Sequence, residues 1–154
     1  MNPVRVGVIG IGNMGWHHAR VLSLIKDAQL VGVADPDPVR GQLATEQFGC
    51  RWFPTYETLL AEVDAVCIAV PTLLHHRVGL ACLRAGVHVL IEKPIAATQE
   101  EATELSAAAE QAGRLLQVDV SVRPTPNPNF RRVDARVLDQ GSYVLQLSTV
   151  MGRQ

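Results

Sequence analysis

The 154-residue chain lacks any apolar run that approaches the roughly 20 residues needed to cross a bilayer. It also lacks an excess of charge of either sign, because fourteen Lys plus Arg stand against fifteen Asp plus Glu and leave a net charge of -1. That balance argues against nucleic acid or an anionic membrane as the main partner. The first residues enter a strand pattern at once, without the charged and apolar regions of a signal peptide. We therefore expect a soluble, cytoplasmic protein.

Cysteine is scarce as well. Cys50, Cys67 and Cys82 are an odd number, with no C-x-x-C pair and no histidine at ligand spacing. This usage argues against a disulfide framework and against a metal site. Cys67 lies inside an apolar run and is interpreted as a small buried hydrophobe.

Short apolar runs alternate with helix-like stretches at a spacing typical of βαβ units. Hydrophobic residues make up 47% of the chain and charged residues 19%, which is globular composition. The pattern predicts an α/β fold with a doubly wound parallel sheet, the Rossmann architecture. The expected strands are 4–9, 29–34, 64–70, 87–91 and 115–118, with a short segment at 51–53, and the expected helices are 13–25, 38–48, 56–61, 74–85 and 98–113.

Several residues predict where these helices begin and end. Asp37 can cap the second helix with Pro38 at its first position, and Gly49 stands where a left-handed cap belongs. Thr98 and Glu101 have the spacing of a capping box.

The composition changes after residue 118. Three prolines occur between residues 123 and 129, so we expect an extended linker at 121–129. Residues 130–139 could form a helix ended by Gly141, and 143–150 a strand. The expected organisation is a dinucleotide-binding domain at 1–120, the linker, and the truncated start of a C-terminal domain at 130–154.

Residues 10–15 read Gly-Ile-Gly-Asn-Met-Gly, a G-x-G-x-x-G pattern directly after a strand and opening a helix. In this context Gly10 allows a tight turn, Gly12 lets the backbone approach a pyrophosphate, and Gly15 lets helix and strand pack closely. The N–H groups at the helix start then face the anion. We predict a dinucleotide loop, with an ordinary Gly-rich strand–helix turn as the alternative.

Asp35 ends the second strand, twenty residues beyond Gly15. A carboxylate there accepts hydrogen bonds from ribose hydroxyls and repels a 2′-phosphate, which favours NAD over NADP. Two alternatives stay open: Asp37 as the ribose ligand instead of a helix cap, and Arg40 as a partner for the 2′-phosphate of NADP.

Glu92, Lys93 and Pro94 follow a buried strand, at the carboxyl edge where doubly wound sheets place their chemistry. A lysine there can donate to a substrate hydroxyl or carbonyl oxygen and tune a proton relay. A solvated lysine at a strand end is the alternative. An X–Pro bond such as Lys93–Pro94 is also the place where a cis peptide occurs.

Four segments together resemble one family: the Gly loop, Asp35, the run Val70-Pro71-Thr72-Leu73-Leu74-His75, and the run Ala85 to Pro94, which ends Ile-Glu-Lys-Pro. They occur in the order and spacing of the glucose–fructose oxidoreductase / inositol dehydrogenase (Gfo/Idh/MocA) group of NAD(P)-dependent oxidoreductases. The similarity covers residues 3–118. It implies hydride transfer between a nicotinamide cofactor and a sugar, a cyclitol or a similar alcohol.

The resemblance also implies roles for particular residues. Lys93 matches the family's catalytic lysine, which binds and polarises the substrate hydroxyl, and His75 matches a histidine near the nicotinamide ribose. Thr72 stands where the family usually has Asn. His17, His18 and His76 have no match and are expected on the surface or on a helix face. The residues expected to bind the cofactor are Gly10, Gly12, Asn13, Met14, Gly15, Asp35, Pro71, Thr72, His75, Glu92, Lys93 and Pro94.

Family members usually run to more than twice this length, with a second α/β domain that supplies the substrate pocket. Asp119 occupies a position usually held by Gly, and Pro124 one that is usually aromatic. The second domain is therefore expected to be missing or truncated here. A non-catalytic NAD(H)-binding module that acts through a protein partner is the alternative function. The surface that the second domain covers would then recruit another subunit, which makes a homo-oligomer one expected assembly.

Overall fold

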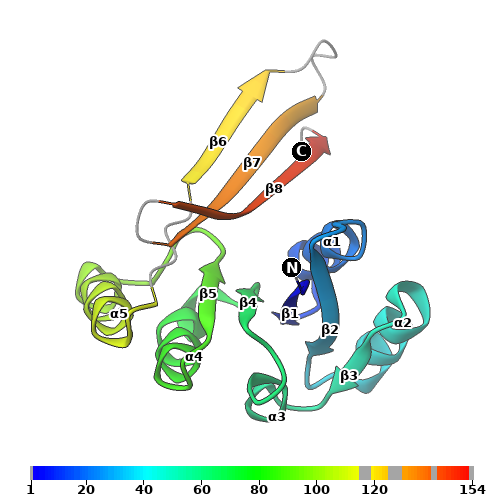
Figure 1. The fold of residues 1–154 in the computed structure, drawn as a ribbon, viewed down its shortest axis with the longest axis horizontal. Helices are drawn as coiled ribbons and strands as arrows, with labels where there is room; N and C mark the ends of the chain where they lie inside the picture. Colours follow the sequence, from blue (N-terminus) through cyan, green and yellow to red (C-terminus); the bar gives the residue numbers. More distant parts are fainter. Residues whose placement is uncertain (1, 115–118, 125–129, 140–141, 153–154) are drawn as a thin grey trace.

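A computed structural model describes residues 2–114, 119–124, 130–139 and 142–152, with side chains up to Arg114. Within these residues the chain forms a five-stranded parallel sheet and a separate three-stranded antiparallel sheet (Figure 1). The strands are β1 (Val4–Ile9), β2 (Ala28–Ala34), β3 (Arg51–Phe53), β4 (Ala65–Ile68), β5 (His88–Ile91), β6 (Asp119–Pro124), β7 (Phe130–Asp139) and β8 (Ser142–Gly152). The helices are α1 (Asn13–Leu22), α2 (Pro38–Phe48), α3 (Tyr56–Leu60), α4 (Thr72–Arg84) and α5 (Gln99–Ala112).

The parallel sheet has the strand order β3-β2-β1-β4-β5. The chain builds outward from β1 through β2 to β3, then returns to the other side of β1 and continues through β4 to β5. Val8 of β1 is thus paired with Val33 of β2 on one side and with Cys67 of β4 on the other. This arrangement confirms the predicted doubly wound sheet. It also makes the carboxyl ends of β1 and β4 the switch point, where such sheets hold their ligands.

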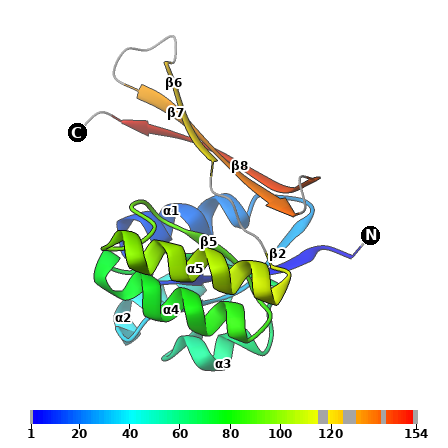
Figure 2. The same ribbon diagram turned by 90° about the vertical axis from the view of Figure 1, so that its left-hand side faces the viewer.

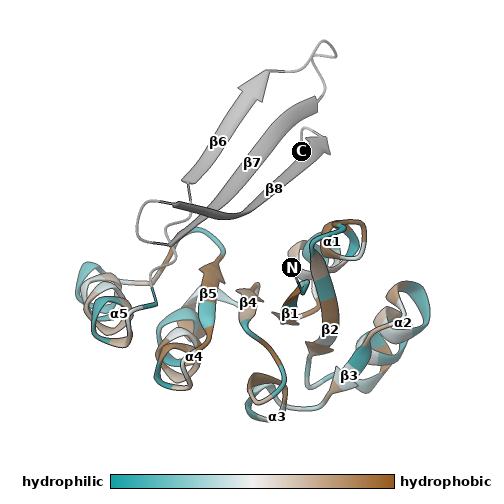
Figure 3. Cartoon of the chain, in the orientation of Figure 1, coloured by the Kyte–Doolittle hydropathy of each residue, from teal (hydrophilic) through white to brown (hydrophobic). Residues whose placement is uncertain are grey.

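Both faces of this sheet are covered, which explains why the strands read as almost continuous apolar runs. Alternate residues of one strand belong to different cores: Val66 and Ile68 pack with α3, α4 and α5, whereas Cys67 packs with α1 and α2. Figure 2 shows α4 and α5 side by side on their face of the sheet. Figure 3 shows brown, apolar colouring along β4, with polar teal on the helices. The five-stranded unit therefore has a core on each side of a buried sheet.

The helix ends follow the predicted signals. The Asp37 side chain accepts a hydrogen bond from Val39 N at the start of α2, and Gly49 ends α2 with a left-handed φ of 66°. At α5, Thr98 Oγ1 accepts from Glu101 N, while the Glu101 carboxylate reaches Ala97 N, one residue before the cap. Other bounds moved by a few residues, since α1 ends at 22 and α4 begins at 72.

The predicted helix at 130–139 is wrong, because these residues form strand β7, paired with β6 on one side and β8 on the other. The sequence alternates apolar residues at 133, 135 and 137 with charged residues at 132, 134 and 136, which is the strand period of two. The strand expected at 143–150 is confirmed within β8. Residues 121–124 of the expected linker belong to β6. The strand expected at 115–118 and the linker residues 125–129 lie outside the described residues.

None of the helices in the described part of the chain has the length and apolar character that a bilayer crossing requires.

Hydrogen bonds between Arg5 and Asp64 join the amino ends of β1 and β4, and their contribution to stability can be measured. The Asp64 carboxylate accepts from Arg5 N at 3.0 Å, from Arg5 Nε at 3.1 Å and from the other guanidinium arm at 2.6 Å. These hydrogen bonds hold the pKa of Asp64 below its ordinary value. We expect Asp64→Asn to lower the free energy of unfolding by about 1 kcal/mol at pH 7, since the pair is partly exposed. Urea unfolding measures the loss.

The sign of the pH dependence follows from the lowered pKa. The stabilisation is complete above the ordinary aspartate pKa of about 4 and is lost as the pH falls through the lower pKa of the folded protein. The difference between wild type and Asp64→Asn should therefore shrink in acid. Glu46→Gln, which changes an exposed carboxylate on α2, is the control and should leave stability unchanged at both pH values. A difference for Asp64→Asn that persists below the folded pKa would contradict the assignment.

Candidate functional site

The predicted site segments lie in a row at the carboxyl edge of the parallel sheet. The main-chain ladder continues one residue beyond the strands: Gly10 N donates to Ala34 O at 2.8 Å, Ala69 N to Ile9 O at 2.8 Å, and Glu92 N to Ile68 O at 3.0 Å. Asp35 N likewise donates to Phe53 O. The Gly loop, the end of β2, the start of α4 and the segment after β5 are thereby fixed side by side.

The Gly loop joins β1 to α1 in a shape that only glycine allows at two positions. Gly10 has a φ of 87°, in the left-handed region, and a Cβ there would lie 2.8 Å from Ala69 O. A Cβ on Gly15 would lie 1.8 Å from Gly10 O, so α1 meets the loop without a side chain between them. Gly12 differs, because among the side chains that the structure describes no heavy atom beyond its chain neighbours lies within 4 Å of the position its Cβ would take. That open space above the start of α1 fits the close approach of a pyrophosphate.

The first turn of α1 carries no side-chain cap, which leaves its N–H groups to other acceptors. Gly12 occupies the cap position, and the adjacent Asn13 is exposed while Met14 is half-buried. No acidic side chain stands in this turn. The turn is therefore electrostatically suited to an anion, as the sequence predicts.

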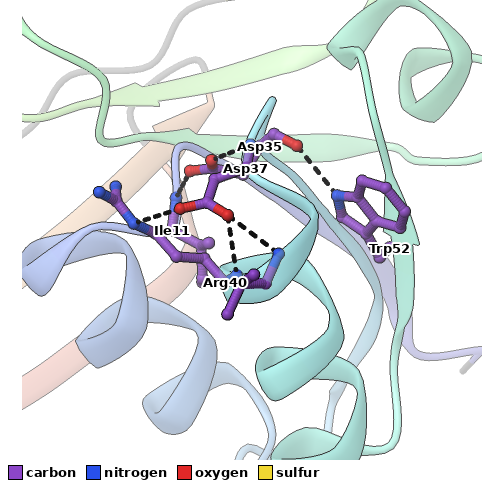
Figure 4. A network of polar contacts seen from close by, with 6 residues as sticks. Ile11, Asp35, Asp37, Arg40 and Trp52 are labelled. Atoms are coloured by element: carbon purple, nitrogen blue, oxygen red, sulfur yellow. Dashed lines mark hydrogen bonds and ion pairs between the residues drawn. The ribbon is translucent and has the colours of Figure 1, made fainter.

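Asp35 is one of two buried polar residues in the described part of the chain, with 6% of its surface exposed. Its two carboxylate oxygens accept from Ile11 N at 2.8 Å and from Asp37 N at 2.9 Å (Figure 4). Trp52 Nε1 donates to the Asp35 main-chain oxygen at 2.9 Å. Asp35 therefore ties the Gly loop to the end of β2. Since a carboxylate oxygen accepts more than one hydrogen bond, both oxygens keep capacity for a ribose hydroxyl.

Asp37 and Arg40 form a separate contact at the start of α2. One Asp37 oxygen accepts from Val39 N at 2.9 Å and Arg40 N at 3.4 Å, and the other pairs with Arg40 Nε at 3.2 Å (Figure 4). The capping role predicted for Asp37 is thus the one its contacts satisfy. Arg40 is held by the same carboxylate, in a pair that is about half exposed.

The next segment enters α4 at Thr72, with Pro71 at the cap position and Pro71 O accepting from Leu74 N. Thr72 is half-buried and Pro71 exposed. His75 is 1% exposed, and its Nδ1 and Nε2 lie 2.9 Å from Pro94 O and 2.8 Å from Val70 O. Carbonyl oxygens only accept, so the tautomer of the ring decides which of the two oxygens receives its proton. His75 joins the end of β4 to the segment after β5.

Lys93 and Pro94 are exposed at this edge, and the peptide bond between them is cis. Glu92 is half-buried, and its Oε1 lies 2.6 Å from Nε2 of His18 on α1. The hydrogen bond from His18 is the largest cause that lowers the pKa of Glu92, and burial opposes it. Lys93 is thus an exposed ammonium next to a carboxylate that is held in its charged form.

Two of these residues were missed by sequence reasoning. His18 was expected on the surface or on a helix face, but its side chain is 15% exposed and bonded to Glu92, 74 positions away. Trp52 carried no signal for its bond to Asp35. His17 is exposed as expected, and His76 pairs with Glu104 between α4 and α5. No local pattern encodes such partners, because they depend on the order of the strands.

The three cysteines are packed in the interior of the protein and have no nucleophilic character. Cys50, Cys67 and Cys82 are free and buried, and desolvation raises the pKa of Cys67 and of Cys82 to about 12. Thiols with such pKa values are not nucleophiles at neutral pH. Within the described residues there is no cluster of three or more His, Cys, Asp or Glu that could hold a metal ion.

A match to a family model shows the family to which this chain belongs. The model of an oxidoreductase family with an NAD-binding Rossmann fold, Gfo/Idh/MocA, matches residues 4–120. The chain belongs to the Gfo/Idh/MocA family. A second model, type II secretion system protein I, matches residues 89–152, less than half of the chain, and overlaps β5 and α5 of the Rossmann unit.

Curated Gfo/Idh/MocA relatives support the assignment over most of this chain. It is 40% identical over 132 residues to UDP-N-acetylglucosamine 3-dehydrogenase of Acidithiobacillus ferrooxidans, covering 86% of this chain and 42% of that protein. It is 38% identical over 142 residues to inositol 2-dehydrogenase 2 of Saccharopolyspora erythraea, covering 90% and 41%. The chain thus spans about two-fifths of the length of these relatives, and the part it shares is the NAD-binding domain.

Solved structures agree with the family model and with the curated relatives. GenD2 from gentamicin A biosynthesis, in complex with NAD, is 33% identical with a TM-score of 0.72, over 75% of this chain and 34% of that one. A variant of KijD10, a 3-ketoreductase from Actinomadura kijaniata, in complex with TDP-benzene and NADP, is 36% identical with a TM-score of 0.71, over 74% and 36%. Neighbours of this Gfo/Idh/MocA domain therefore bind either NAD or NADP.

Proposed function

We propose that this chain is the nucleotide-binding part of an NAD-dependent oxidoreductase that transfers hydride between the cofactor and an alcohol carbon of a sugar or cyclitol. One observation carries the proposal: an open approach at Gly12 and a buried carboxylate at Asp35 stand side by side at the carboxyl edge. The first suits a pyrophosphate and the second a ribose diol. Relatives named as dehydrogenases of sugars and inositol support the substrate class.

Different residues along the carboxyl edge would bind different parts of the cofactor. Gly10, Gly12 and Gly15, with the first turn of α1, would hold the pyrophosphate. Asp35 would accept hydrogen bonds from the adenosine ribose. Asn13 and Met14 stand in that same turn, and Pro71, Thr72 and His75 stand at the start of α4, towards the nicotinamide end. When bound, the nicotinamide supplies the hydride acceptor or donor.

Lys93 is the proposed catalytic group, with Glu92 and Pro94 beside it. Its exposed ammonium would donate a hydrogen bond to the substrate oxygen and pass on the hydroxyl proton. In any catalytically active form of the protein, Lys93→Ala should abolish turnover and leave the dissociation constant of NADH within about twofold. A large loss of NADH affinity would instead make Lys93 a cofactor ligand.

Calorimetric titration of the 154-residue chain with NADH and, separately, with NADPH tests the proposal. NADH should bind several-fold more tightly than NADPH, because the Asp35 carboxylate repels a 2′-phosphate. Absence of binding of both nucleotides would overturn the proposal. Tighter binding of NADPH would overturn the assignment of Asp35 and favour Arg40 as a phosphate ligand.

Substitution of Asp35 tests its role in the choice of cofactor. Asp35→Asn keeps the shape of the side chain and removes the charge, so we expect NADH affinity to fall about tenfold and the preference over NADPH to disappear, both measured by calorimetry. Asp37→Asn is the matched control, because asparagine is an equally good helix cap. If Asp37→Asn weakened NADH binding and Asp35→Asn did not, Asp37 would be the ribose ligand.

The remaining expectations concern partners and location. We propose a small sugar or polyol as substrate and a homo-oligomer as the assembly, which size-exclusion chromatography with light scattering tests directly. A cytoplasmic location stays a prediction.

A further inference from the structure

One side-chain contact joins the two halves of the candidate site. His18 stands in the second turn of α1, the helix that opens at the Gly loop, and Glu92 directly follows β5. Their Nε2 and Oε1 atoms are 2.6 Å apart, and the side chains are 15% and 21% exposed. The helix expected to receive the pyrophosphate is thus bonded to the residue that precedes Lys93.

The charges around this contact favour a fixed geometry. Glu92 lies between His18 on α1 and its chain neighbour Lys93, and both help to lower its pKa, with the hydrogen bond from His18 as the largest cause. The negative charge of Glu92 also helps to raise the pKa of the buried Cys67 thiol on β4, although burial is the larger cause. His17, next to His18, is exposed. A short hydrogen bond in a half-buried place holds two segments more firmly than an exposed pair does.

We propose that His18 is a positioning residue that couples nucleotide binding at the Gly loop to the placement of Lys93. This inference rests on the proposed function. A shift of α1 when an anion binds at its first turn is carried through the His18–Glu92 hydrogen bond to the strand end that holds the lysine. His18 touches neither cofactor nor substrate in this scheme. It sets where the Lys93 ammonium stands once the loop is filled.

The chain offers a clean readout, because it has only two lysines, Lys26 and Lys93. Reductive methylation with ¹³C-formaldehyde labels both lysines and the α-amino group without removing their charge, and Lys93→Arg assigns the Lys93 signal. Lys26 lies between α1 and β2, at the amino edge of the sheet, so its signal serves as the internal control. ADP is the ligand, since it fills the adenosine and phosphate positions and has no nicotinamide to touch Lys93 directly. Tryptophan fluorescence follows ADP binding in the same sample, because Trp16 is on α1 and Trp52 is bonded to Asp35.

In wild type, saturating ADP should move the Lys93 methyl resonance and leave the Lys26 resonance in place. In His18→Gln the ADP dissociation constant should stay within about threefold of wild type while the Lys93 response is lost. Glu92→Gln removes the same ion pair from the other side and should give the same loss, so the test does not depend on one variant folding well. His76→Gln is the matched control: it removes a similar His–Glu contact, at 2.8 Å from Glu104, away from the Gly loop, and should keep the full response.

The outcomes separate the two claims. An equal Lys93 response in wild type, His18→Gln and Glu92→Gln overturns the coupling. So does an unmoved Lys93 resonance in wild type that binds ADP, in which case the proposed function stands. If neither ADP nor NADH binds to wild type, the proposed function fails and the coupling falls with it.

Discussion

Replacement of Gly15 by alanine is expected to abolish NADH binding and to lower the free energy of unfolding by about 3 kcal/mol. The added Cβ would lie 1.8 Å from Gly10 O and 2.8 Å from Gly10 C, and neither atom is at the end of a flexible side chain. Either α1 or the Gly loop must therefore move. Both segments carry the N–H groups that are expected to bind the pyrophosphate. A movement of either one therefore disrupts the pyrophosphate site as well as the packing of α1 on the loop. Thermal or urea unfolding and calorimetric titration with NADH measure the two effects.

Gly12→Ala is the matched control, since it adds the same methyl group three positions before Gly15, at the cap position of α1. Within the described part of the chain, nothing beyond the chain neighbours lies within 4 Å of that Cβ, and Gly12 has a φ of -69°, which any L residue adopts. This variant should keep the stability of wild type and still lose NADH affinity, by about tenfold or more, because the methyl group occupies the space that a phosphate needs. Wild-type affinity in Gly12→Ala would show that the nucleotide does not approach this loop.

The contrast between these two glycines shows what the sequence could predict. The G-x-G-x-x-G pattern after an apolar strand and the acid after the next strand predicted where the Gly loop and Asp35 stand in the fold, and the structure has them there. Caps such as Asp37 and Gly49 predicted the ends of α2, because capping is a local interaction between neighbouring residues. Patterns of this kind report local geometry, and local geometry is what they predicted well.

The errors have a physical pattern too. Residues 130–139 were expected to form a helix ended by Gly141, whereas the period of two and the pairing with β6 and β8 make a strand. Whether such a segment becomes helix or strand depends on partners that are distant in sequence. The same holds for His18 and Glu92, whose contact exists only because α1 and the end of β5 meet at one edge of the sheet.

His75 is the residue whose structural surroundings add most to the sequence prediction. It was expected beside the nicotinamide ribose, and in the structure both its ring nitrogens are engaged by main-chain oxygens of Val70 and Pro94. We therefore expect His75→Phe to lower the free energy of unfolding by about 2 kcal/mol, because phenylalanine fills the same buried position with no group that can donate to a main-chain oxygen. NADH affinity should fall as well, since the start of α4 and the segment after Lys93 lose their connection. Urea unfolding and calorimetry measure the two losses.

The neighbouring histidine provides the control for His75→Phe. His76 is one position further along α4, and its Glu104 partner is largely exposed, so His76→Phe should change stability by less than about 0.5 kcal/mol. If His75→Phe kept wild-type stability but lost NADH affinity, the ring would act on the cofactor directly, as the family resemblance implies. If it lost stability and kept the affinity of the remaining folded protein, the connection between Val70 and Pro94 would serve the fold alone. The expected result is a loss of both stability and NADH affinity. It would mean that the packing of α4 and the shape of the nicotinamide end both depend on the His75 side chain.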